Sequence, residues 1–196
     1  MIGITGGIGS GKSRISRELI RRGYSVYDCD REAKRIIVEN PEVRKAIINL
    51  LGEEAFQRPT TNDQRPIYNT AYVAKRVFED KALLEAINKI VHPAVKEDII
   101  AKQPDFVESA ILYEAGIDVL CERIIVIDAQ EDICIERTIG RDYKGEMTED
   151  NINKVRARMR TQAPHIGDLM VWNDGLRETP VVVDAILSWL RKEQLA

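Results

Sequence analysis

The stretch Gly6-Gly7-Ile8-Gly9-Ser10-Gly11-Lys12-Ser13 fits the phosphate-binding pattern G-x-x-x-x-G-K-[ST]. Residues 2–5, which precede it, have the pattern of a short buried strand, and Ile15, Leu19 and Ile20 recur after it at helical spacing. A strand before the loop and a helix after it form the context in which this pattern binds phosphate. The alternative, a flexible glycine-rich turn before a helix, leaves the register of these residues unexplained. The stretch therefore predicts nucleotide binding, but it does not identify the acceptor of a phosphate.

The residue types in this loop suit the chemistry of phosphate binding. Glycines let the backbone turn tightly and bring its N–H groups close to an anion, and the following helix adds the positive end of its dipole. In such loops the lysine, here Lys12, reaches the β- and γ-phosphates, and the hydroxyl of the next residue, here Ser13, coordinates Mg²⁺. We therefore expect both side chains to contact the nucleotide or its metal ion.

The composition argues against several other classes of protein. The 196-residue chain is 44% hydrophobic and 31% charged, which is ordinary for a globular protein, and its net charge of −3 gives no support to nucleic-acid binding. It has no apolar run long enough to span a membrane and no signal-peptide pattern. The three cysteines are scattered without metal-ligand spacing, which indicates reduced thiols in a cytoplasmic protein.

Strand-like segments alternate with helical ones along the chain. There are five of them, at 2–5, 25–27, 106–112, 123–128 and 169–172. This alternation predicts an α/β fold with a five-stranded parallel sheet flanked by helices, in which 25–27 lies next to the P-loop strand. Ligands of such sheets bind at the carboxyl ends of the strands, so we expect the polar residues that follow these strands to converge.

A long stretch with little strand character separates the second strand from the third. It holds helical patterns over 31–39, 42–51, 72–78 and 81–91. A polar, turn-rich segment covers 52–66. We predict a nucleotide-binding core over 1–30 and 104–196, closed by a helix over 179–193, and a helical substrate domain over 31–103.

Charged residues are dense between 138 and 162, and a segment of this composition is expected to supply little core. We interpret it as a lid within the nucleotide-binding core that closes over the phosphates. Arg137 and Arg141 are four residues apart on one helix face, where they could clamp a transferring phosphoryl group. The alternative is a solvated face on which Glu136 and Asp142 are their surface partners.

Phosphoryl transfer to an alcohol requires a carboxylate that orients or deprotonates the acceptor hydroxyl. Asp28 and Asp30 follow the second strand, where one of them could do this. The alternative for Asp30 is that it caps the helix that begins at Arg31. The pair as a whole can serve both roles.

Two glutamates and a histidine are further candidates. Glu108 lies in an otherwise apolar segment, where a carboxylate can organise Mg²⁺ as in Walker-B sites, and Glu114 follows at the expected strand end. The alternative for both is a surface charge, which suits Glu108 less well because its neighbours are apolar. His92 and Pro93 end an apolar helical stretch, and a histidine there is more often a hydrogen-bonded structural residue than a catalyst.

Several motifs together resemble the dephospho-coenzyme A kinase family. The P-loop from Thr5 to Ser13 is similar to the P-loop sequence of the family, and Val26 to Asp30 is similar to its hydrophobic-x-Asp-x-Asp segment. Further likenesses follow in the expected order over most of the chain, at Arg76 to Phe78 with His92 and Pro93, Ser109 to Glu114, Arg137 to Asp142, Arg158 to Gln162, and Val171 to Gly175. This combination is far more specific than the P-loop alone.

The resemblance implies transfer of the γ-phosphoryl group of ATP, with Mg²⁺, to the ribose 3′-hydroxyl of dephospho-CoA, which completes coenzyme A. By match, Asp30 is the base, assisted by Lys12, Arg137 and Arg141. ATP contacts are expected at Gly9, Ser10, Gly11, Lys12, Ser13, Arg14 and Asn173, the last near the adenine. Substrate contacts are expected at Asp30, Arg76, His92 and Glu114, and metal contacts at Ser13 and Glu108.

The chain also departs from the family's pattern. Arg14 stands where a small residue, often a threonine that contacts the α-phosphate, is usual. Asn69-Thr70 replaces a pair that contains a basic residue, so a basic substrate contact is either missing or supplied by Arg65 or Arg76. The segment from Gln162 to Asn173 is shorter than usual. These departures affect individual contacts more than the reaction.

Two other functions stay open. One is a P-loop kinase that acts on a nucleoside monophosphate or a sugar acid. The other is a GTP-dependent switch. Such proteins recognise guanine through Asn/Thr-Lys-x-Asp, but Asn88-Lys89-Ile90-Val91 lacks the aspartate. Asp142-Tyr143-Lys144-Gly145 has the spacing of their D-x-x-G motif but lies in the expected lid. The sequence does not indicate an oligomeric state.

Overall fold

The computed structural model describes residues 1–57, 66–160, 162 and 165–193. Most of the turn-rich segment predicted over 52–66 lies outside these residues. The chain divides into two compact units, one made of Met1–Tyr27 with Pro104–Ala196 and the other of Asp28–Gln103. Within the described residues, none of the helices combines the length and apolarity that crossing a membrane requires.

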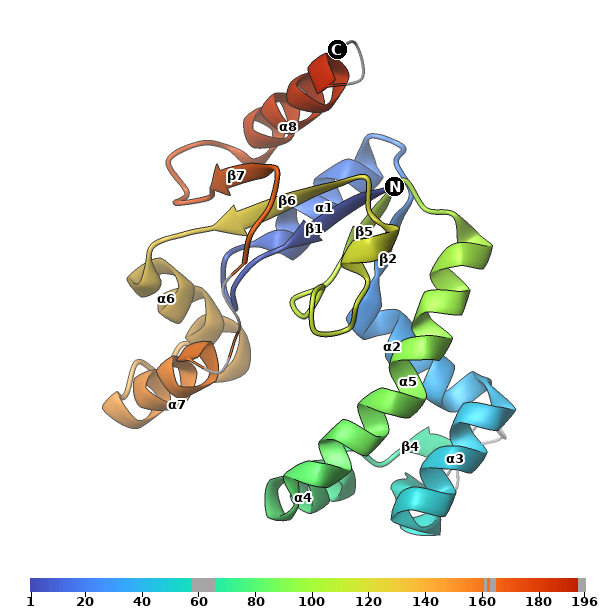
Figure 1. Cartoon of the computed structure of the whole chain (residues 1–196). Helices are drawn as coiled ribbons and strands as arrows, with labels where there is room; N and C mark the ends of the chain where they lie inside the picture. Colours follow the sequence, from blue (N-terminus) through green and yellow to red (C-terminus); the bar gives the residue numbers. More distant parts are fainter. Residues whose placement is uncertain (58–65, 161, 163–164, 194–196) are drawn as a thin grey trace. The chain divides into compact units, whose positions relative to one another are not determined.

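The first unit is built on a five-stranded sheet with the order β2-β5-β1-β6-β7 (Figure 1). The strands are β1 (Ile2–Thr5), β2 (Val26–Asp28), β5 (Phe106–Glu108), β6 (Arg123–Asp128) and β7 (Leu169–Trp172). β1 runs parallel to both β5 and β6, and β6 runs parallel to β7. The α/β class and the five-stranded parallel sheet predicted from the sequence are therefore confirmed.

The order of the strands and the length of β5 differ from the sequence prediction. β5, and not β2, is the neighbour of β1, and this pairing sets Glu108 opposite Ile4. The strand predicted over 106–112 ends at Glu108. After Glu108 the chain leaves the ladder through turns, in which the backbone N–H of Ala115 bonds to the carbonyl of Ile111. Glu114 consequently lies in a turn and not at a strand end.

Helices α1 (Lys12–Arg21) and α8 (Thr179–Glu193) bury their apolar faces against the sheet. Ile4 of β1, Ile125 and Ile127 of β6, and Ile15 and Leu19 of α1 all have no exposed surface. Ile125 and Ile127 share one face of β6 because side chains alternate along a strand. Burying each of these side chains stabilises the fold by roughly 1.5–3 kcal/mol, so this cluster holds the P-loop between two fixed elements.

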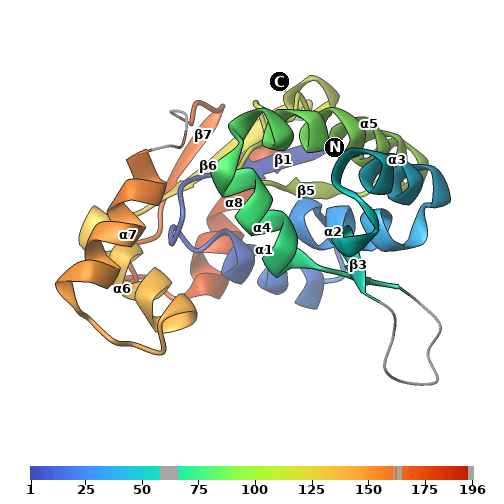
Figure 2. The ribbon, with the colours of Figure 1, turned by 90° about the horizontal axis from the view of Figure 1, so that it is seen from below.

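The segment predicted as a lid forms parts of two helices, α6 (Glu131–Asp142) and α7 (Glu149–Arg160), which lie side by side in Figures 1 and 2. Ile135 and Ile139 of α6 are buried with Val155 of α7, and Met159 packs against them. This cluster is small, which agrees with the expectation that the charged segment supplies little core. Val155 and Met159 are four residues apart, so α7 keeps one apolar stripe despite its many charges.

The second unit is mainly helical. Its elements are α2 (Cys29–Glu39), α3 (Pro41–Leu51), the short helix η1 (Glu53–Ala55), strands β3 (Phe56–Gln57) and β4 (Ile67–Tyr68), α4 (Thr70–Glu79) and α5 (Lys81–Lys102). The prediction ended α5 at 91, but the helix continues through Pro93. Val95 and Ile99 extend its buried face beyond the proline, and α5 packs against α2 and α3. This burial outweighs the one helical hydrogen bond that the proline cannot make.

An ion-pair cluster joins α2 to α5 within the second unit. Glu32 is 8% exposed and accepts hydrogen bonds from Arg35 Nε at 2.8 Å and Lys102 Nζ at 2.7 Å. Asp98 accepts one from Arg35 Nη2 at 2.8 Å. Burial acts to raise the pKa of Glu32, but the hydrogen bonds from Lys102 and Arg35 prevail and lower it to about 2. Glu32 is therefore charged in the folded protein over the ordinary pH range.

The substitution Glu32→Gln should lower the free energy of unfolding by roughly 1–3 kcal/mol, because Arg31, Arg35 and Lys102 lose their buried carboxylate partner. Since folding lowers the pKa of Glu32 from 4.5 to about 2, its contribution is complete above about pH 5 and is lost as the pH falls towards 2. Urea unfolding followed by circular dichroism at several pH values measures both effects.

The matched control is Glu39→Gln, because Glu39 bonds the same Arg35 from an exposed position. This change should cost less than about 1 kcal/mol. If Glu32→Gln left the acid dependence of unfolding as it is in the unaltered protein, the assignment of that dependence to Glu32 would be wrong.

Candidate phosphate-binding site

The P-loop leaves β1 after Thr5 and enters α1 at Lys12. Gly11 is the N-cap of α1 with φ +97°, and Gly9 has φ +78°, both in the left-handed region that disfavours other residues. A Cβ at Gly11 would collide with the side-chain amide of Asn173, and one at Gly9 would collide with the carbonyl of Cys134. The two glycines therefore allow the loop to pack directly against α6 and the end of β7.

The lysine and serine of the loop occupy two different surroundings. Lys12 Nζ donates hydrogen bonds to the carbonyls of Gly6 at 2.7 Å and Gly7 at 2.9 Å, so its ammonium group lies across the first half of the loop. Ser13 Oγ donates to Glu108 Oε1 at 2.9 Å, and Glu108 is only 8% exposed. The structure thus brings together the two residues that the sequence suggested as metal ligands.

Asn173 supports the loop from the end of β7. Its buried side-chain nitrogen donates to the carbonyl of Ser10 at 2.7 Å, and its backbone N–H donates to the carbonyl of Asp128 at 2.7 Å. Asn173 was expected near the adenine of ATP. In the structure its amide nitrogen bonds the loop itself, and its contact with the adenine stays a prediction.

The two arginines of α6 have different partners. Arg137 Nη1 donates to the carbonyls of Gly9 and Ser10 at 3.4 Å each. Arg141 Nε donates to Asp142 at 2.6 Å. This hydrogen bond, opposed by burial and assisted by one from Arg158, lowers the pKa of Asp142 to about 2. Arg137 is therefore directed to the loop, whereas Arg141 has the surface partner that the alternative interpretation offered.

A hollow of about 380 Å³ opens beside the loop, where α1 meets α6. It is lined by Gly9, Gly11, Lys12, Ser13, Arg14, Arg17, Arg137 and Arg141. Every charged side chain in this lining is positive, which suits a polyanion. Sequence reasoning did not identify Arg17. Its spacing from Arg14, three residues along α1, is the signal that would have found it.

Asp28 and Asp30 are distinguished by the geometry at the start of α2. Asp28 is the N-cap, with an extended backbone and a side chain that accepts a hydrogen bond from the backbone N–H of Arg31 at 3.1 Å. The hypothesis that Asp30 caps this helix is therefore wrong, because β2 runs directly into the helix and leaves the cap position to Asp28. The carboxylate of Asp30 is exposed in the first turn.

The other expected substrate residues are spread over both units. Arg76 Nη1 donates to the Tyr72 hydroxyl at 3.2 Å, and Arg76 Cζ lies 5.9 Å from the centre of the Tyr72 ring. His92 lies inside α5, where burial, followed by the charge of Lys96, lowers its pKa. Glu114 is exposed in the turn after β5. Contact of these three residues with a substrate stays a prediction.

The sheet, the loop and the cationic hollow define a P-loop kinase fold with a site for a phosphorylated nucleotide. A family model described as dephospho-CoA kinase matches residues 1–177. The chain is 38% identical over 167 residues to the dephospho-CoA kinase of Porphyromonas gingivalis, covering 82% of this chain and 76% of that protein. The chain belongs to the dephospho-CoA kinase family, so the resemblance noted in the sequence is confirmed. ATP is the phosphoryl donor of such kinases.

Two solved structures agree with this fold. The dephospho-CoA kinase from Campylobacter jejuni superposes with a TM-score of 0.61 at 17% identity, covering 98% of both chains. A shikimate kinase from Acinetobacter baumannii superposes with a TM-score of 0.59 at 14% identity, covering 100% of this chain and 94% of the other. At these identities the likeness concerns the fold alone.

The substitution Asn173→Ala should weaken ATP and ADP binding by roughly tenfold, because the buried carbonyl of Ser10 loses its donor and the loop loses its shape. Isothermal titration calorimetry with each nucleotide measures this loss. Asp174→Ala is the control, since the Asp174 side chain accepts a hydrogen bond from the nearby backbone N–H of Leu176. Equal affinities for the two variants would contradict the supporting role of Asn173.

Proposed function

We propose that this chain transfers the γ-phosphoryl group of ATP to the ribose 3′-hydroxyl of dephospho-CoA, forming coenzyme A and ADP. The cationic hollow at the P-loop, in a chain whose first 177 residues match this kinase family, is the observation that supports it. A polyphosphate fits a hollow in which all the charged side chains are positive. The acceptor is proposed from the family.

The proposed mechanism relies on positioning and electrostatics, as is usual for phosphoryl transfer. Lys12, Arg137 and Arg141 stabilise negative charge on the transferring group and on the leaving ADP. Asp30 orients the 3′-hydroxyl and accepts its proton as the new O–P bond forms. The bond from the γ-phosphorus to the β–γ bridging oxygen breaks at the same time.

Ser13 and Glu108 are suited to hold Mg²⁺. They offer a hydroxyl and a carboxylate oxygen 2.9 Å apart, both hard ligands of the kind that Mg²⁺ prefers. Glu108 is buried beside the loop, which explains why an acidic residue lies in an otherwise apolar strand. When bound, the ion would neutralise charge on the β- and γ-phosphates.

The remaining roles follow the division of the chain. We assign nucleotide binding to 1–30 and 104–196, and we assign dephospho-CoA binding to 31–103, with contacts from Arg76 and His92. Glu114, in the nucleotide-binding part, also contacts the substrate in this proposal, and 138–162 acts as the lid. Among the described residues Cys29, Cys121 and Cys134 are all free thiols, which supports a cytoplasmic location.

The test of this function is an acceptor screen. The purified chain is incubated with ATP, Mg²⁺ and one acceptor at a time, and ADP release is followed. The acceptors are dephospho-CoA, a nucleoside monophosphate, shikimate and gluconate. Mass spectrometry of the product then locates the new phosphate. We expect turnover with dephospho-CoA at least about a hundredfold faster than with the others. Preference for another acceptor would replace the proposed substrate.

The substitution Asp30→Asn should lower kcat by about 10²–10⁴-fold, because the asparagine amide is too weak a base to accept the proton of the acceptor hydroxyl. ATP affinity should stay within about twofold, since Asp30 is not part of the loop that holds the phosphates. Steady-state kinetics and calorimetry separate the two. Asp28→Asn is the comparison, because asparagine caps a helix as well as aspartate does. If the larger fall in kcat followed Asp28→Asn, the base would be the other carboxylate.

A further inference from the structure

Gln162 and His165, between α7 and β7 in the chain, both contact the segment where β1 passes into the P-loop. Gln162 Oε1 accepts a hydrogen bond from the backbone N–H of Ile8 at 2.8 Å. The hydroxyl of Tyr113, in the turn after β5, donates to the carbonyl of Ile166. These contacts flank His165 on both sides, so its position is set by the loop and by the turn next to it.

His165 has one ring nitrogen bonded and the other without a partner. Its Nδ1 lies 3.3 Å from the hydroxyl of Thr5, the fully buried last residue of β1. Its Nε2 is buried and has no hydrogen-bond partner among the residues that the structure describes. A buried polar nitrogen left in this state costs free energy, and in native proteins it calls for an explanation such as a ligand.

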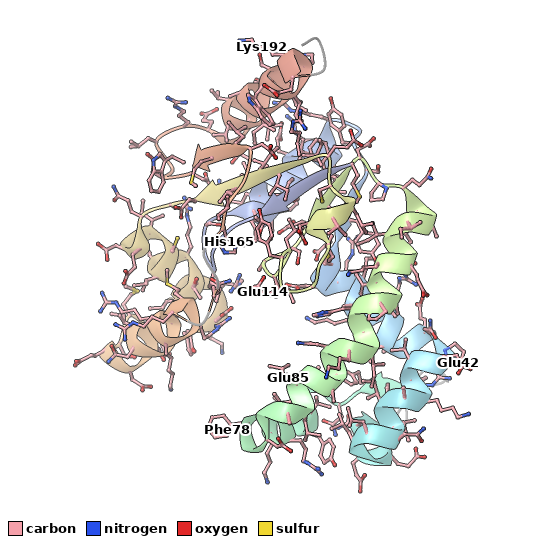
Figure 3. The ribbon with its side chains drawn as sticks, in the orientation of Figure 1. Glu42, Phe78, Glu85, Glu114, His165 and Lys192 are labelled. Carbon is pink, nitrogen blue, oxygen red and sulfur yellow. The ribbon has the colours of Figure 1, made fainter. Side chains whose placement is uncertain are left out.

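The charges that face His165 come from three elements. Lys12 of α1, Glu114 of the turn after β5 and Asp128 at the end of β6 all act on the ring. Burial has the largest effect on the pKa of His165 and lowers it, the charge of Lys12 lowers it further, and the two carboxylates oppose them. Figure 3 labels His165 and Glu114, which lie near each other in that view.

Lys12 indicates which part of a nucleotide belongs next to this ring. Its ammonium group lies on the carbonyls of Gly6 and Gly7, immediately after Thr5. The lysine of a P-loop reaches the β- and γ-phosphates, so the terminal phosphate comes to this end of the loop. The contact of Nδ1 with Thr5 holds the His165 ring, and with it the unpartnered Nε2, at the same end.

We propose that His165 Nε2 donates a hydrogen bond to the terminal phosphate of bound ATP, which makes His165 a residue that distinguishes ATP from ADP. With the Thr5 hydroxyl donating to Nδ1, the neutral ring carries its proton on Nε2, as this bond requires. A protonated ring donates from the same nitrogen, and a phosphate oxygen favours that form. The inference rests on the use of ATP by this family and not on the acceptor.

The test compares affinities for ATP and ADP in the absence of any acceptor. Calorimetry on the full chain with Mg²⁺ should show that His165→Ala weakens ATP binding about tenfold and ADP binding less than about twofold. His165→Gln should restore most of the loss, because its amide nitrogen can take the place of Nε2. Equal losses for ATP and ADP, or no loss for either, would overturn the proposal.

A second measurement uses the unaltered protein and does not depend on how the alanine variant folds. The chain has two histidines, so its imidazole proton spectrum contains two titration curves, and the His165→Gln spectrum assigns them. ATP should raise the pKa of His165 above its value with ADP, since the γ-phosphate adds negative charge beside the ring. ATP affinity should then fall as the pH rises through that pKa. Identical titration curves with ATP and ADP would also overturn the proposal.

These outcomes are separate from the test of the proposed function. A chain that phosphorylated another acceptor would still bind ATP, and His165 would still discriminate ATP from ADP. Conversely, phosphorylation of dephospho-CoA by a His165→Ala variant with unchanged ATP affinity would leave the function intact and remove this role of His165.

Discussion

The contact of the P-loop backbone with α6 and the end of β7 is the constraint on which the rest of the site depends. Gly9 and Gly11 have no side chains, so the loop can approach the carbonyl of Cys134 and the side-chain amide of Asn173 more closely than a Cβ atom would allow. Asn173 then satisfies the buried carbonyl of Ser10. Without these supports the loop would adopt many shapes, and its N–H groups would point in different directions. Because the loop is held in one shape, its N–H groups converge on a single anion site.

The same packing explains how the positive charges gather beside the loop. α6 is placed by its contact with Gly9, which brings Arg137 to the loop carbonyls. α7 packs against α6 through the small core around Ile139 and Val155, and its Arg158 pairs with Asp142 of α6. Apolar burial therefore positions charges that repel one another, and a bound polyphosphate would relieve this repulsion.

The carboxylates of the two units have distinct surroundings. Glu108 is buried and accepts a hydrogen bond from the Ser13 hydroxyl. Asp142 lies between Arg141 and Arg158, which keep it ionised. Asp28 caps α2 and leaves Asp30 exposed, so two aspartates two residues apart have different surroundings. In each case the backbone position of the residue, more than its type, decides which role is available to it.

Local sequence determined a large part of this protein. The P-loop pattern, the five strand segments and the helical spacing of the second unit are short-range signals, and each reports on neighbours within a few residues. They sufficed for the fold class, for the loop and for the pairing of Ser13 with Glu108 as candidate metal ligands. The family motifs, read in order, added the family itself, which the comparisons confirm.

Tertiary structure alone decided the features that depend on residues far apart in the chain. The position of β5 beside β1, the continuation of α5 through Pro93 and the apolar contact between α6 and α7 arise from burial against distant partners, which no local pattern contains. The contact between His165 and Thr5 joins residues that are 160 positions apart in the chain. A hydrogen bond of this kind exists only after the sheet has brought the two segments together, so the chain order gives no signal of it.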